Sequence, residues 1–405
     1  MDGKVIETVN WKQNLKVAWL GTFFTGASFS LVMPFMALFV EDLGVAKNRV
    51  EWYAGLAVAI SALASAIFAP VWGRLADRYG RKPMMVRASL MMTFTMGGLA
   101  FIPNVQWLLL LRLLNGIFAG YVPNSTALIA SQVPREKSGY ALGTLATGVT
   151  AGTLIGPLIG GVLAEMVGIR LVFLLVGVIL LICTMMTVLF VKEDFEPVKK
   201  AQVVPTRIIL KRIKSPKMMV SLFVTSMIIQ ISAQSIAPIL ALYIRHLGQT
   251  ENLMFVSGVI VSAMGVSSLL SSSILGKVGD VIGNHRMLLL ALLYSFIMYF
   301  LTALARTSLQ LGLLRFAYGF GVGALMPSIN ALLTRMTPKE GISRIFSFNQ
   351  MFMNIGQVIG PFIGSNVAIL MGYRSVFYVT SIIVLINLIW CTINFRKYIY
   401  VKDIV

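Results

Sequence analysis

The sequence has 405 residues, of which 57% are hydrophobic and only 12% are charged, and its mean hydropathy is +0.84. A soluble protein of this length could not bury so large an apolar fraction, so the composition excludes an ordinary soluble domain and predicts a membrane protein. The net charge of +19 would suggest a nucleic-acid partner for a soluble protein. In a membrane chain, the distribution of the basic residues decides its meaning.

Apolar windows about 20 residues long predict roughly twelve transmembrane helices, because a helix needs that length to cross the hydrocarbon core and satisfies its own backbone there. The predicted fold class is therefore an all-α membrane protein. The expected spans are 15–40, 51–72, 84–102, 105–128, 139–165, 169–191, 217–243, 252–275, 286–305, 309–333, 344–370 and 372–395.

The basic residues fall mainly into alternate loops. Twenty-six of the 34 Lys and Arg lie in the loops on one side and two lie within spans. The other side carries six, which are Lys47, Arg49, Arg170, Arg245, Arg306 and Arg374. By the positive-inside rule this asymmetry predicts a multi-pass protein of the bacterial cell (inner) membrane with both termini in the cytoplasm. The excess charge then indicates contact with anionic lipids and no nucleic-acid partner.

The sequence offers little that would support enzyme chemistry. Cys183 and Cys391 lie in apolar runs, and His246 and His285 lie in loops. No cofactor fingerprint, nucleophile motif or metal-ligand cluster is present. The first apolar run is too long for a cleavable signal. We expect no enzyme activity, no cofactor and no metal.

The sequence contains an internal repeat, in which the second half follows the pattern of the first. Corresponding residues of the two halves are separated by 203 or 204 positions. The matched pairs are Pro34 with Pro238, Asp77 with Asp280, Arg112 with Arg315, and Gly156-Pro157 with Gly360-Pro361. This repeat predicts two six-helix pseudo-symmetric bundles, residues 1–191 and 217–405. A basic cytoplasmic linker, residues 192–216, would join them, with its amphipathic run Arg207–Lys214 along the inner leaflet.

A short, charged turn is predicted at Gly73–Lys82, between the second and third spans. Gly73 and Gly80 would allow close packing and a tight turn. Asp77 could meet a helix N-terminus, while Arg81 and Lys82 would face the cytoplasm. An echo of this pattern begins at Gly276 in the second half.

Two arginines lie within predicted spans, Arg112 in the fourth and Arg315 in the tenth. An ionised side chain inside a membrane is costly, so each is a candidate functional residue. Snorkelling to the headgroups or bonding to backbone carbonyls would be the structural alternative.

The fifth span carries glycines at every fourth position, Gly148, Gly152 and Gly156, followed by Pro157 and Gly160. This spacing produces a smooth groove on one helix face, and the Gly-Pro pair bends the helix. The groove could serve ordinary helix packing or dimerisation. Its counterpart in the second half favours a moving contact between the halves.

Amide and aromatic side chains recur at helical spacing in several spans and predict an inward-facing polar surface. Packing between helices and a polar cavity wall are about equally consistent with this pattern. The candidate substrate-cavity residues are Phe24, Tyr121, Asn124, Gln230, Gln234, Arg315, Asn330, Gln350, Met353, Asn354 and Gln357.

These features resemble the major facilitator superfamily. Gly73–Lys82 is similar to its motif between spans 2 and 3, Arg112–Gly120 to its span 4 arginine motif, and Gly148–Gly161 to its span 5 antiporter motif. The sequence around Pro123–Pro134 is similar to MdtG/PmrA-like bacterial multidrug exporters. The resemblance implies proton-driven efflux of amphiphilic drugs, fluoroquinolones among them, by alternating access in a monomer.

The resemblance also implies roles for particular residues. Gly73, Asp77, Gly80 and Arg81 would lock the outward-facing state at the inner face, with Glu136 and Arg344 as partners. Arg112, together with Asp77, would serve proton coupling. Gly152, Gly156, Pro157 and Gly160 would form the interface that limits leak.

One departure from many drug exporters is the lack of a deep carboxylate, because none of the 15 acidic residues lies far inside a predicted span. The proton carrier is therefore open between Asp77, Glu41 with Asp42, and the substrate itself. Zwitterions, weak acids or neutral amphiphiles would suit such a cavity better than simple cations. A lipid or glycolipid flippase on the same fold is the main alternative, and an importer, receptor or channel fits less well.

Overall fold

The computed structural model describes residues 10–134, 137–195, 215–337 and 342–399. Throughout this part of the chain the regular structure is helical, and twelve helical segments are long and apolar enough to cross a membrane. The predicted all-α class with twelve spans is confirmed. The central run Arg207–Lys214 lies outside the described residues.

The helices fall into two sets that follow one another in the chain. The first half contains α1 (Trp11–Val32), η1 (Met33–Phe35), α2 (Met36–Asp42), η2 (Lys47–Arg49), α3 (Val50–Tyr79), α4 (Arg81–Gly98), η3 (Leu99–Phe101), α5 (Val105–Ile117), α6 (Tyr121–Gln132), α7 (Ser138–Val167) and α8 (Ile169–Phe190). The second half contains α10 (Pro216–Ile236), η5 (Ala237–Ile239), α11 (Leu240–His246), α12 (Leu253–Ile282), α13 (Asn284–Ala303), α14 (Ser308–Met336), α15 (Ile342–Met371) and α16 (Tyr373–Ile399).

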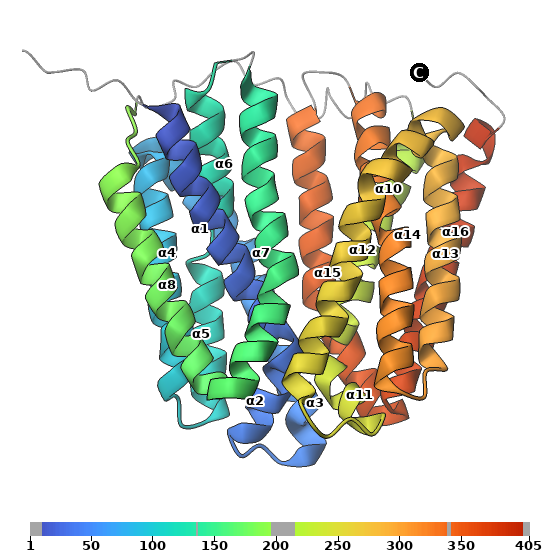
Figure 1. The fold of residues 1–405 in the computed structure, drawn as a ribbon. Coiled ribbons are helices and arrows are strands. Elements are labelled where there is room, and N and C mark those ends of the chain that lie inside the picture. Colours follow the sequence, from blue (N-terminus) through green and yellow to red (C-terminus); the bar gives the residue numbers. More distant parts are fainter. Residues whose placement is uncertain (1–9, 135–136, 196–214, 338–341, 400–405) are drawn as a thin grey trace, which may run out of the picture.

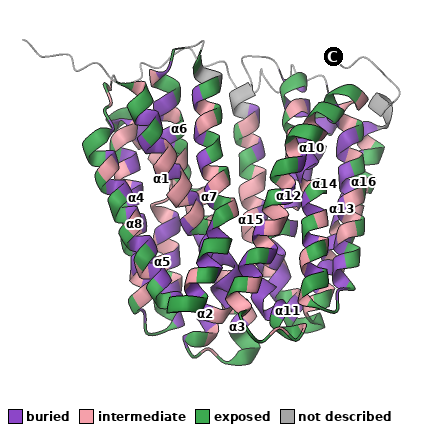
Figure 2. Ribbon diagram, viewed as in Figure 1, coloured by how far each residue is buried: buried purple, intermediate pink, exposed green. Residues whose placement is uncertain are grey.

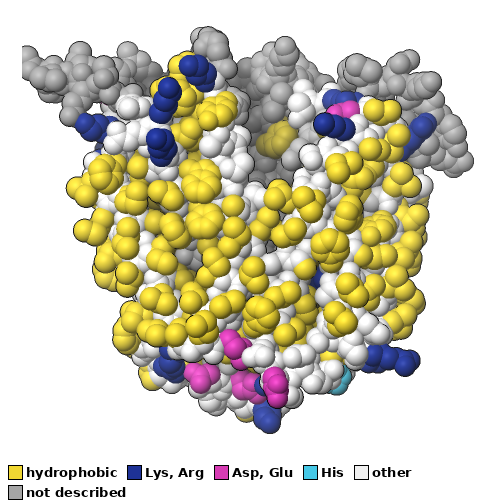
Figure 3. Space-filling view, viewed as in Figure 1, with side chains coloured by type: hydrophobic (Ala, Val, Ile, Leu, Met, Phe, Trp, Pro, Cys, Tyr) yellow, Lys and Arg dark blue, Asp and Glu magenta, His cyan; other side chains and the backbone are white. Residues whose placement is uncertain are grey.

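The two halves stand side by side as bundles (Figure 1). The first helix begins and the last helix ends at the same end of the molecule, at the top of Figure 1, which we call the terminal face. The opposite end is the distal face. A band of hydrophobic side chains covers the middle of the visible surface, and acidic side chains gather at the distal face (Figure 3). Such a band is what a membrane-embedded surface requires.

The halves meet mainly through two helix pairs, α3 with α15 and α7 with α12, and through smaller contacts such as that of α2 with α11. A Cβ atom on Gly55 of α3 would lie 2.9 Å from the carbonyl oxygen of Pro361, and one on Gly258 of α12 would meet the carbonyl oxygen of Pro157. Gly55 and Gly258 are repeat equivalents, as are Pro157 and Pro361. The contact between the halves is therefore built twice, with the glycine and the proline exchanged between the two bundles.

These close contacts lie in the distal part of the helices. Towards the terminal face, Cβ atoms on Gly73 of α3, Gly143 of α7 and Gly276 of α12 would meet no atom within 4 Å. Buried residues are accordingly concentrated where the halves meet near the distal face (Figure 2). The halves are packed together at the distal face and separate towards the terminal face.

The predicted turn at Gly73–Lys82 is wrong for most of its length. Helix α3 continues through Tyr79, and only Gly80 interrupts the helices, with a φ of +99° that favours glycine. Hydropathy marks where a helix leaves the apolar layer, whereas the helix itself ends at the residue that breaks its backbone. The same reasoning explains why α12 extends to Ile282, beyond the predicted end at 275.

The repeated prolines interrupt spans at matching places. Pro34 lies in η1, between α1 and α2, and Pro238 lies in η5, between α10 and α11. A proline lacks the N–H that a continuous helix needs, so each span bends there. The fourth and tenth spans do not match in this way. Gly120, with a φ of +131°, separates α5 from α6, whereas its equivalent Gly323 lies within the continuous α14.

Candidate functional site

Polar contacts join the two halves at the distal face. Arg245 of α11 donates to both carboxylate oxygens of Glu41 of α2, at 2.7 and 3.2 Å. The Tyr373 hydroxyl of α16 donates to Glu51 of α3 at 2.6 Å. Farther along the α7–α12 contact, Ser262 donates to the carbonyl oxygen of Leu154 at 2.8 Å. We call the Glu41–Arg245 and Glu51–Tyr373 contacts the distal gate.

The amides of α15 lie on the face that this helix turns towards the first half. Spacings of four, seven, eleven and fifteen residues place Gln350, Asn354 and Gln357 on one face with Pro361 and Ser365. Pro361 and Ser365 pack against Gly55 of α3 near the distal face. The amides continue this face into the part of the molecule where the halves separate, so they border the space between the bundles.

Two further amides of the second half remain available to a ligand. Gln230 and Gln234 of α10 pack their Cβ atoms against Gly356 and Gly360 of α15. Both side chains are half-buried, and neither forms a hydrogen bond with another described residue. On α15, by contrast, Gln350 donates to Asn354 at 2.9 Å, and Asn349 contacts the Met353 sulfur at 3.7 Å.

The predicted cavity residues of the first half are placed differently. Tyr121 is 1% exposed, and its hydroxyl lies 3.0 Å from the Thr187 hydroxyl of α8. The buried Asn124 donates to the carbonyl oxygen of Gly120 at 2.7 Å. Both side chains are occupied by packing within the first half, so in this conformation they do not form a cavity wall. The Tyr121 hydroxyl finds its partner on α8, and the Asn124 amide bonds to Gly120 at the start of its own helix.

Two more of the predicted cavity residues, Phe24 and Asn330, are partly accessible. Phe24 of α1 is half-buried and packs edge-to-face on Phe23, with ring centroids 5.1 Å apart. Asn330 of α14 is exposed. Neither side chain contacts the amides of α15 through a hydrogen bond in the described part of the chain.

The glycine motif of α7 faces its own half. Cβ atoms on Gly148, Gly152, Gly156 and Gly160 would each clash with α1, through residues between Trp19 and Leu31. The contact with the second half is made by the neighbouring face of α7, where Pro157 meets Gly258. The groove therefore seats α1 against α7, whereas Pro157 and Gly161 reach the other bundle, where a Cβ on Gly161 would meet Met254 of α12.

The predicted lock residues are only partly brought together. Arg81 donates to Asp77, which is exposed at the terminal end of α3. Glu136 lies outside the described residues, and Arg344 is in α15 but its side chain is not among the described side chains. In this conformation the Asp77–Arg81 pair forms within the first half.

Sequence reasoning missed Glu193, which follows α8. Its carboxylate accepts hydrogen bonds from the backbone N–H groups of Arg81 and Lys82 at 2.8 and 2.7 Å. It thereby caps the N-terminus of α4, where unpaired N–H groups and the helix dipole favour an anion. Glu193 is more than 100 residues from its partners in the chain, and no local pattern indicates the contact.

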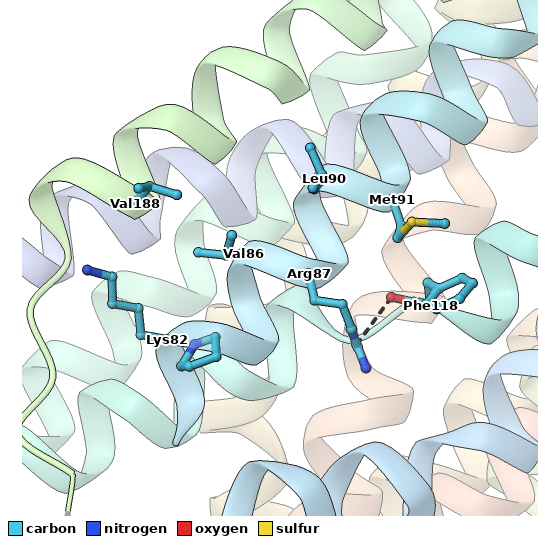
Figure 4. Close-up of a pocket in the computed structure, with 8 residues that line it drawn as sticks. Lys82, Val86, Arg87, Leu90, Met91, Phe118 and Val188 are labelled. Carbon is cyan, nitrogen blue, oxygen red and sulfur yellow. Dashed lines mark hydrogen bonds between the residues drawn. The ribbon is translucent and has the colours of Figure 1, made fainter. Parts of the chain in front are cut away.

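Arg87 of α4 was also missed. Its guanidinium stacks over the Trp72 ring at 3.5 Å and donates to the carbonyl oxygen of Ala119 at 3.0 Å. It also donates to the carbonyl oxygen of Phe118 at 3.2 Å (Figure 4). The Trp72 indole donates to the carbonyl oxygen of Ile117 at 2.6 Å. Together they satisfy the carbonyls freed where α5 ends.

A hollow of about 540 Å³ lies beside Arg87, and Figure 4 shows the side chains that line it. Its lining residues come from α4, α8 and the α5–α6 interruption, all in the first half. It includes none of the predicted cavity residues.

The two intramembrane arginines differ in their surroundings. Arg112 is 1% exposed, and its Nε and Nη2 atoms have no hydrogen-bond partner in the described part of the chain. Arg315 is 7% exposed and lines a cavity of about 110 Å³ between α10, α11, α12 and α14. The glycines one turn on, Gly116 and Gly319, pack each arginine-bearing helix closely on α3 and α12 respectively.

Comparison with known sequences agrees with these features. Residues 18–260 and 222–398 match the sequence profile of the Major Facilitator Superfamily. The multi-drug resistance efflux pump PmrA of Streptococcus pneumoniae serotype 4 is 60% identical over 396 residues, which cover 98% of this chain and 99% of that protein. A PmrA homolog of Lactococcus lactis is 55% identical, with 98% of each chain covered. The multidrug resistance protein MdtG of Serratia proteamaculans is 49% identical over 95% of this chain and 94% of that protein.

Solved structures share the fold at low sequence identity. A bacterial homolog of the human lysosomal transporter Spinster, in an inward-facing and unoccupied conformation, superposes with a TM-score of 0.80 at 14% identity, covering 96% of this chain and 97% of that one. The nucleoside transporter NupG gives a TM-score of 0.76 at 13% identity, covering 95% and 99%. At such identities the likeness concerns the fold alone.

Proposed function

Because the chain belongs to the Major Facilitator Superfamily, we propose that it is a multidrug exporter that drives amphiphilic compounds, including fluoroquinolones, out of the cell against protons. The observation that carries the proposal is its 60% identity to an efflux pump over nearly the full length of both chains. In the described part of the chain the two bundles are tightly joined at one end, which supports an alternating-access mechanism.

We assign the terminal face to the cytoplasm of a bacterial inner membrane, since the loops on that side carry most of the Lys and Arg. The conformation is then closed towards the outside by the distal gate and open towards the cytoplasm. This is the state in which an exporter would take up a drug from the cell. The basic terminal face would also contact anionic lipid headgroups.

The proposed drug-binding surface is the amide face of α15 together with Gln230 and Gln234 of α10. Gln230 and Gln234, which form no hydrogen bond with another described residue, can bond to polar groups on many different compounds, which suits a broad substrate range. The protein would act as a monomer, since α10 and α15, the two helices that form this surface, belong to one chain.

Proton coupling is assigned to Arg112 and Asp77. Arg112 would contribute a fixed positive charge, because its guanidinium stays protonated. This charge is buried and unpaired, and the groups that surround it would differ between the inward-facing and outward-facing conformations. Asp77 can exchange its bond with Arg81 for contacts across the terminal face when the halves close there. The proton gradient is the energy source, with no cofactor.

The test uses purified protein in liposomes with an imposed pH gradient. Movement of a fluoroquinolone is compared with that of the permanent cation ethidium, in the parent protein, in Arg112→Ala and in the exposed-loop control Arg306→Ala. We expect gradient-dependent fluoroquinolone transport that Arg112→Ala abolishes and Arg306→Ala retains. If neither drug moves while a labelled lipid does, the exporter proposal is wrong and the chain is a flippase.

A further inference from the structure

The cavity at Arg315 has the features of a built site. It is about 110 Å³ in volume, which is the space of roughly three or four water molecules. Its lining is otherwise uncharged, with apolar side chains such as Ile229, Leu240 and Val322 around the guanidinium. Ala233 on its rim is exposed, so a molecule can reach the cavity from the surface of α10.

The charge of Arg315 has no protein counter-ion in the described part of the chain. Nη1 lies 3.8 Å from the Met264 sulfur, and the guanidinium carbon lies 5.5 Å from the centre of the Phe377 ring. The buried Tyr299 hydroxyl also lies close enough to interact with the guanidinium, and Tyr318 lines the same cavity. All four neighbours are uncharged, so none of them neutralises a positive charge. A buried charge without a partner costs several kcal/mol, so this arrangement favours an anion from outside the protein.

The acidic residues of the second half cannot supply that anion from their described positions. They are Glu251, Asp280, Glu340 and Asp403. Glu251 lies in the distal loop between α11 and α12, and Asp280 pairs with Arg335 at 3.5 Å near the terminal end of α12. Glu340 and Asp403 lie outside the described residues.

Arg315 differs from its repeat equivalent Arg112 in that a ligand can reach its guanidinium. Arg112 occupies the equivalent place in the first half but is sealed at 1% exposure. Arg315 presents its planar group to an open volume. A guanidinium matches a carboxylate with two parallel hydrogen bonds, and such bonds strengthen where water is excluded.

We propose that the Arg315 cavity is an anion subsite that binds the carboxylate of an amphiphilic substrate. This inference rests on the proposed export function and specifies its substrate class as carboxylate-bearing amphiphiles. The cavity is too small for a whole drug, so the carboxylate end enters it while the rest of the molecule lies outside. Gln230 and Gln234, on the same helix as Ile229 and Ala233, are placed to meet the remaining polar groups.

The experiment measures binding by calorimetry, with the full-length protein in nanodiscs. The probes are norfloxacin and its methyl ester, which share a ring system and differ in the carboxylate. We expect the parent protein to bind the acid roughly 10- to 100-fold more tightly than the ester, as expected for a charge-assisted hydrogen bond. Arg315→Gln should reduce binding of the acid to the level of the ester and leave the ester unchanged. Arg315→Lys should fall between.

Two controls keep the result interpretable. Arg306→Gln removes the same charge from an exposed loop and should change neither affinity. Ala233→Leu narrows the cavity entrance without touching Arg315, and should weaken the acid selectively even if Arg315→Gln fails to fold.

Three outcomes would overturn the inference. The first is equal binding of acid and ester by the parent protein, and the second is equal weakening of both by Arg315→Gln. The third is ester binding that requires chloride, since the cavity would then hold an inorganic anion beside the drug. If the parent protein also fails to transport either liposome drug, the proposed function itself is wrong. If both drugs are transported but the acid and the ester bind equally well, only the carboxylate subsite is wrong and the proposed export function stands.

Discussion

Glu41 and Arg245, which form the bidentate ion pair of the distal gate, occupy the same position in the two repeats, 204 residues apart. An acid in one half therefore meets a base at the equivalent place in the other. The pair lies at the ends of α2 and α11, on opposite sides of the boundary between the bundles. Closure of the distal face thus depends on a difference between two otherwise matching elements.

Breaking this pair should favour opening of the distal face. Both side chains are partly exposed, at 26% for Glu41 and 41% for Arg245, so their bond is worth no more than ~1 kcal/mol. We expect Glu41→Gln to raise the open population several-fold, seen as faster maleimide labelling of a cysteine placed at Met254. The double change Glu41→Arg with Arg245→Glu should restore the parent rate. Failure of the exchanged pair to restore it would show that the charges do not hold the gate.

The Gly258–Pro157 contact should tolerate no added side chain. A Cβ at Gly258 meets backbone atoms of Pro157 and Leu158, which cannot move aside as a flexible side chain would. We expect Gly258→Ala to lower the melting temperature of the purified protein and to impair distal closure. Gly276→Ala, in open space on the same helix, should leave the melting temperature unchanged or slightly raised, because alanine favours a helix over glycine by about 1 kcal/mol. Equal effects of the two substitutions would contradict a tight contact.

Loss of the Glu193 cap should loosen the start of α4. Glu193→Gln removes the charge that two backbone N–H groups bond to, which should cost about 0.5–2 kcal/mol locally. Hydrogen exchange at residues 81–84 is the measurement, with faster exchange expected in the variant. Asp194→Asn is the matched control, since this exposed neighbour makes no contact with another described residue. The assignment is wrong if both variants exchange alike.

The interrupted fourth span should depend on Arg87. Its repeat equivalent is Leu290, and the equivalent helix α14 is continuous. Arg87→Leu leaves the carbonyls of Phe118 and Ala119 without these bonds, and we expect a loss of about 1–3 kcal/mol in stability, read as a lower melting temperature. Lys82→Leu removes a charge from the same hollow without breaking a hydrogen bond of its side chain, and should have little effect. A larger effect of Lys82→Leu would place the stabilisation in the hollow rather than in the carbonyl contacts.

The open and closed parts of α15 can be distinguished chemically. Asn354 and Ser365 share one face of the helix, but Asn354 is half-buried while Ser365 is fully buried against Gly55. In inside-out vesicles, a membrane-impermeant maleimide should label Asn354→Cys quickly and Ser365→Cys slowly. The native Cys183 and Cys391 are free but buried, so background labelling should be low. Labelling of Asn354→Cys from the outside instead would reverse the assigned topology.

The sequence predicted those features that follow from local composition and from the repeat. Span number follows from hydropathy, and helical spacing alone decides which of the α15 amides share a face. Helix ends were placed too early, since charge at Asp77 and Lys277 marks the membrane boundary and not the backbone break at Gly80 or Gly283.

Contacts between distant segments could not be predicted in this way. Nothing in the pattern around Tyr121 shows that Thr187 satisfies its hydroxyl, or that Glu193 reaches α4. The glycine motif of α7 was interpreted as a moving contact between the halves, whereas Gly148, Gly152, Gly156 and Gly160 pack on α1 of their own half. Spacing predicts a packing surface but does not reveal which neighbour it meets. Only the arrangement of the helices shows that α1 takes this position and that Pro157 faces the second half.

The distal contacts indicate how the two repeats came together in evolution. A dimer of identical six-helix units could form the Gly55–Pro361 and Gly258–Pro157 contacts. The two contacts are equivalent, because in each a glycine of one unit meets the same proline of the other. It could not form the Glu41–Arg245 pair, since identical units would bring two acids or two bases to the axis. The glycine–proline contacts are therefore compatible with a separate ancestral subunit, whereas the ion pair could arise only after duplication and fusion had let the two copies diverge.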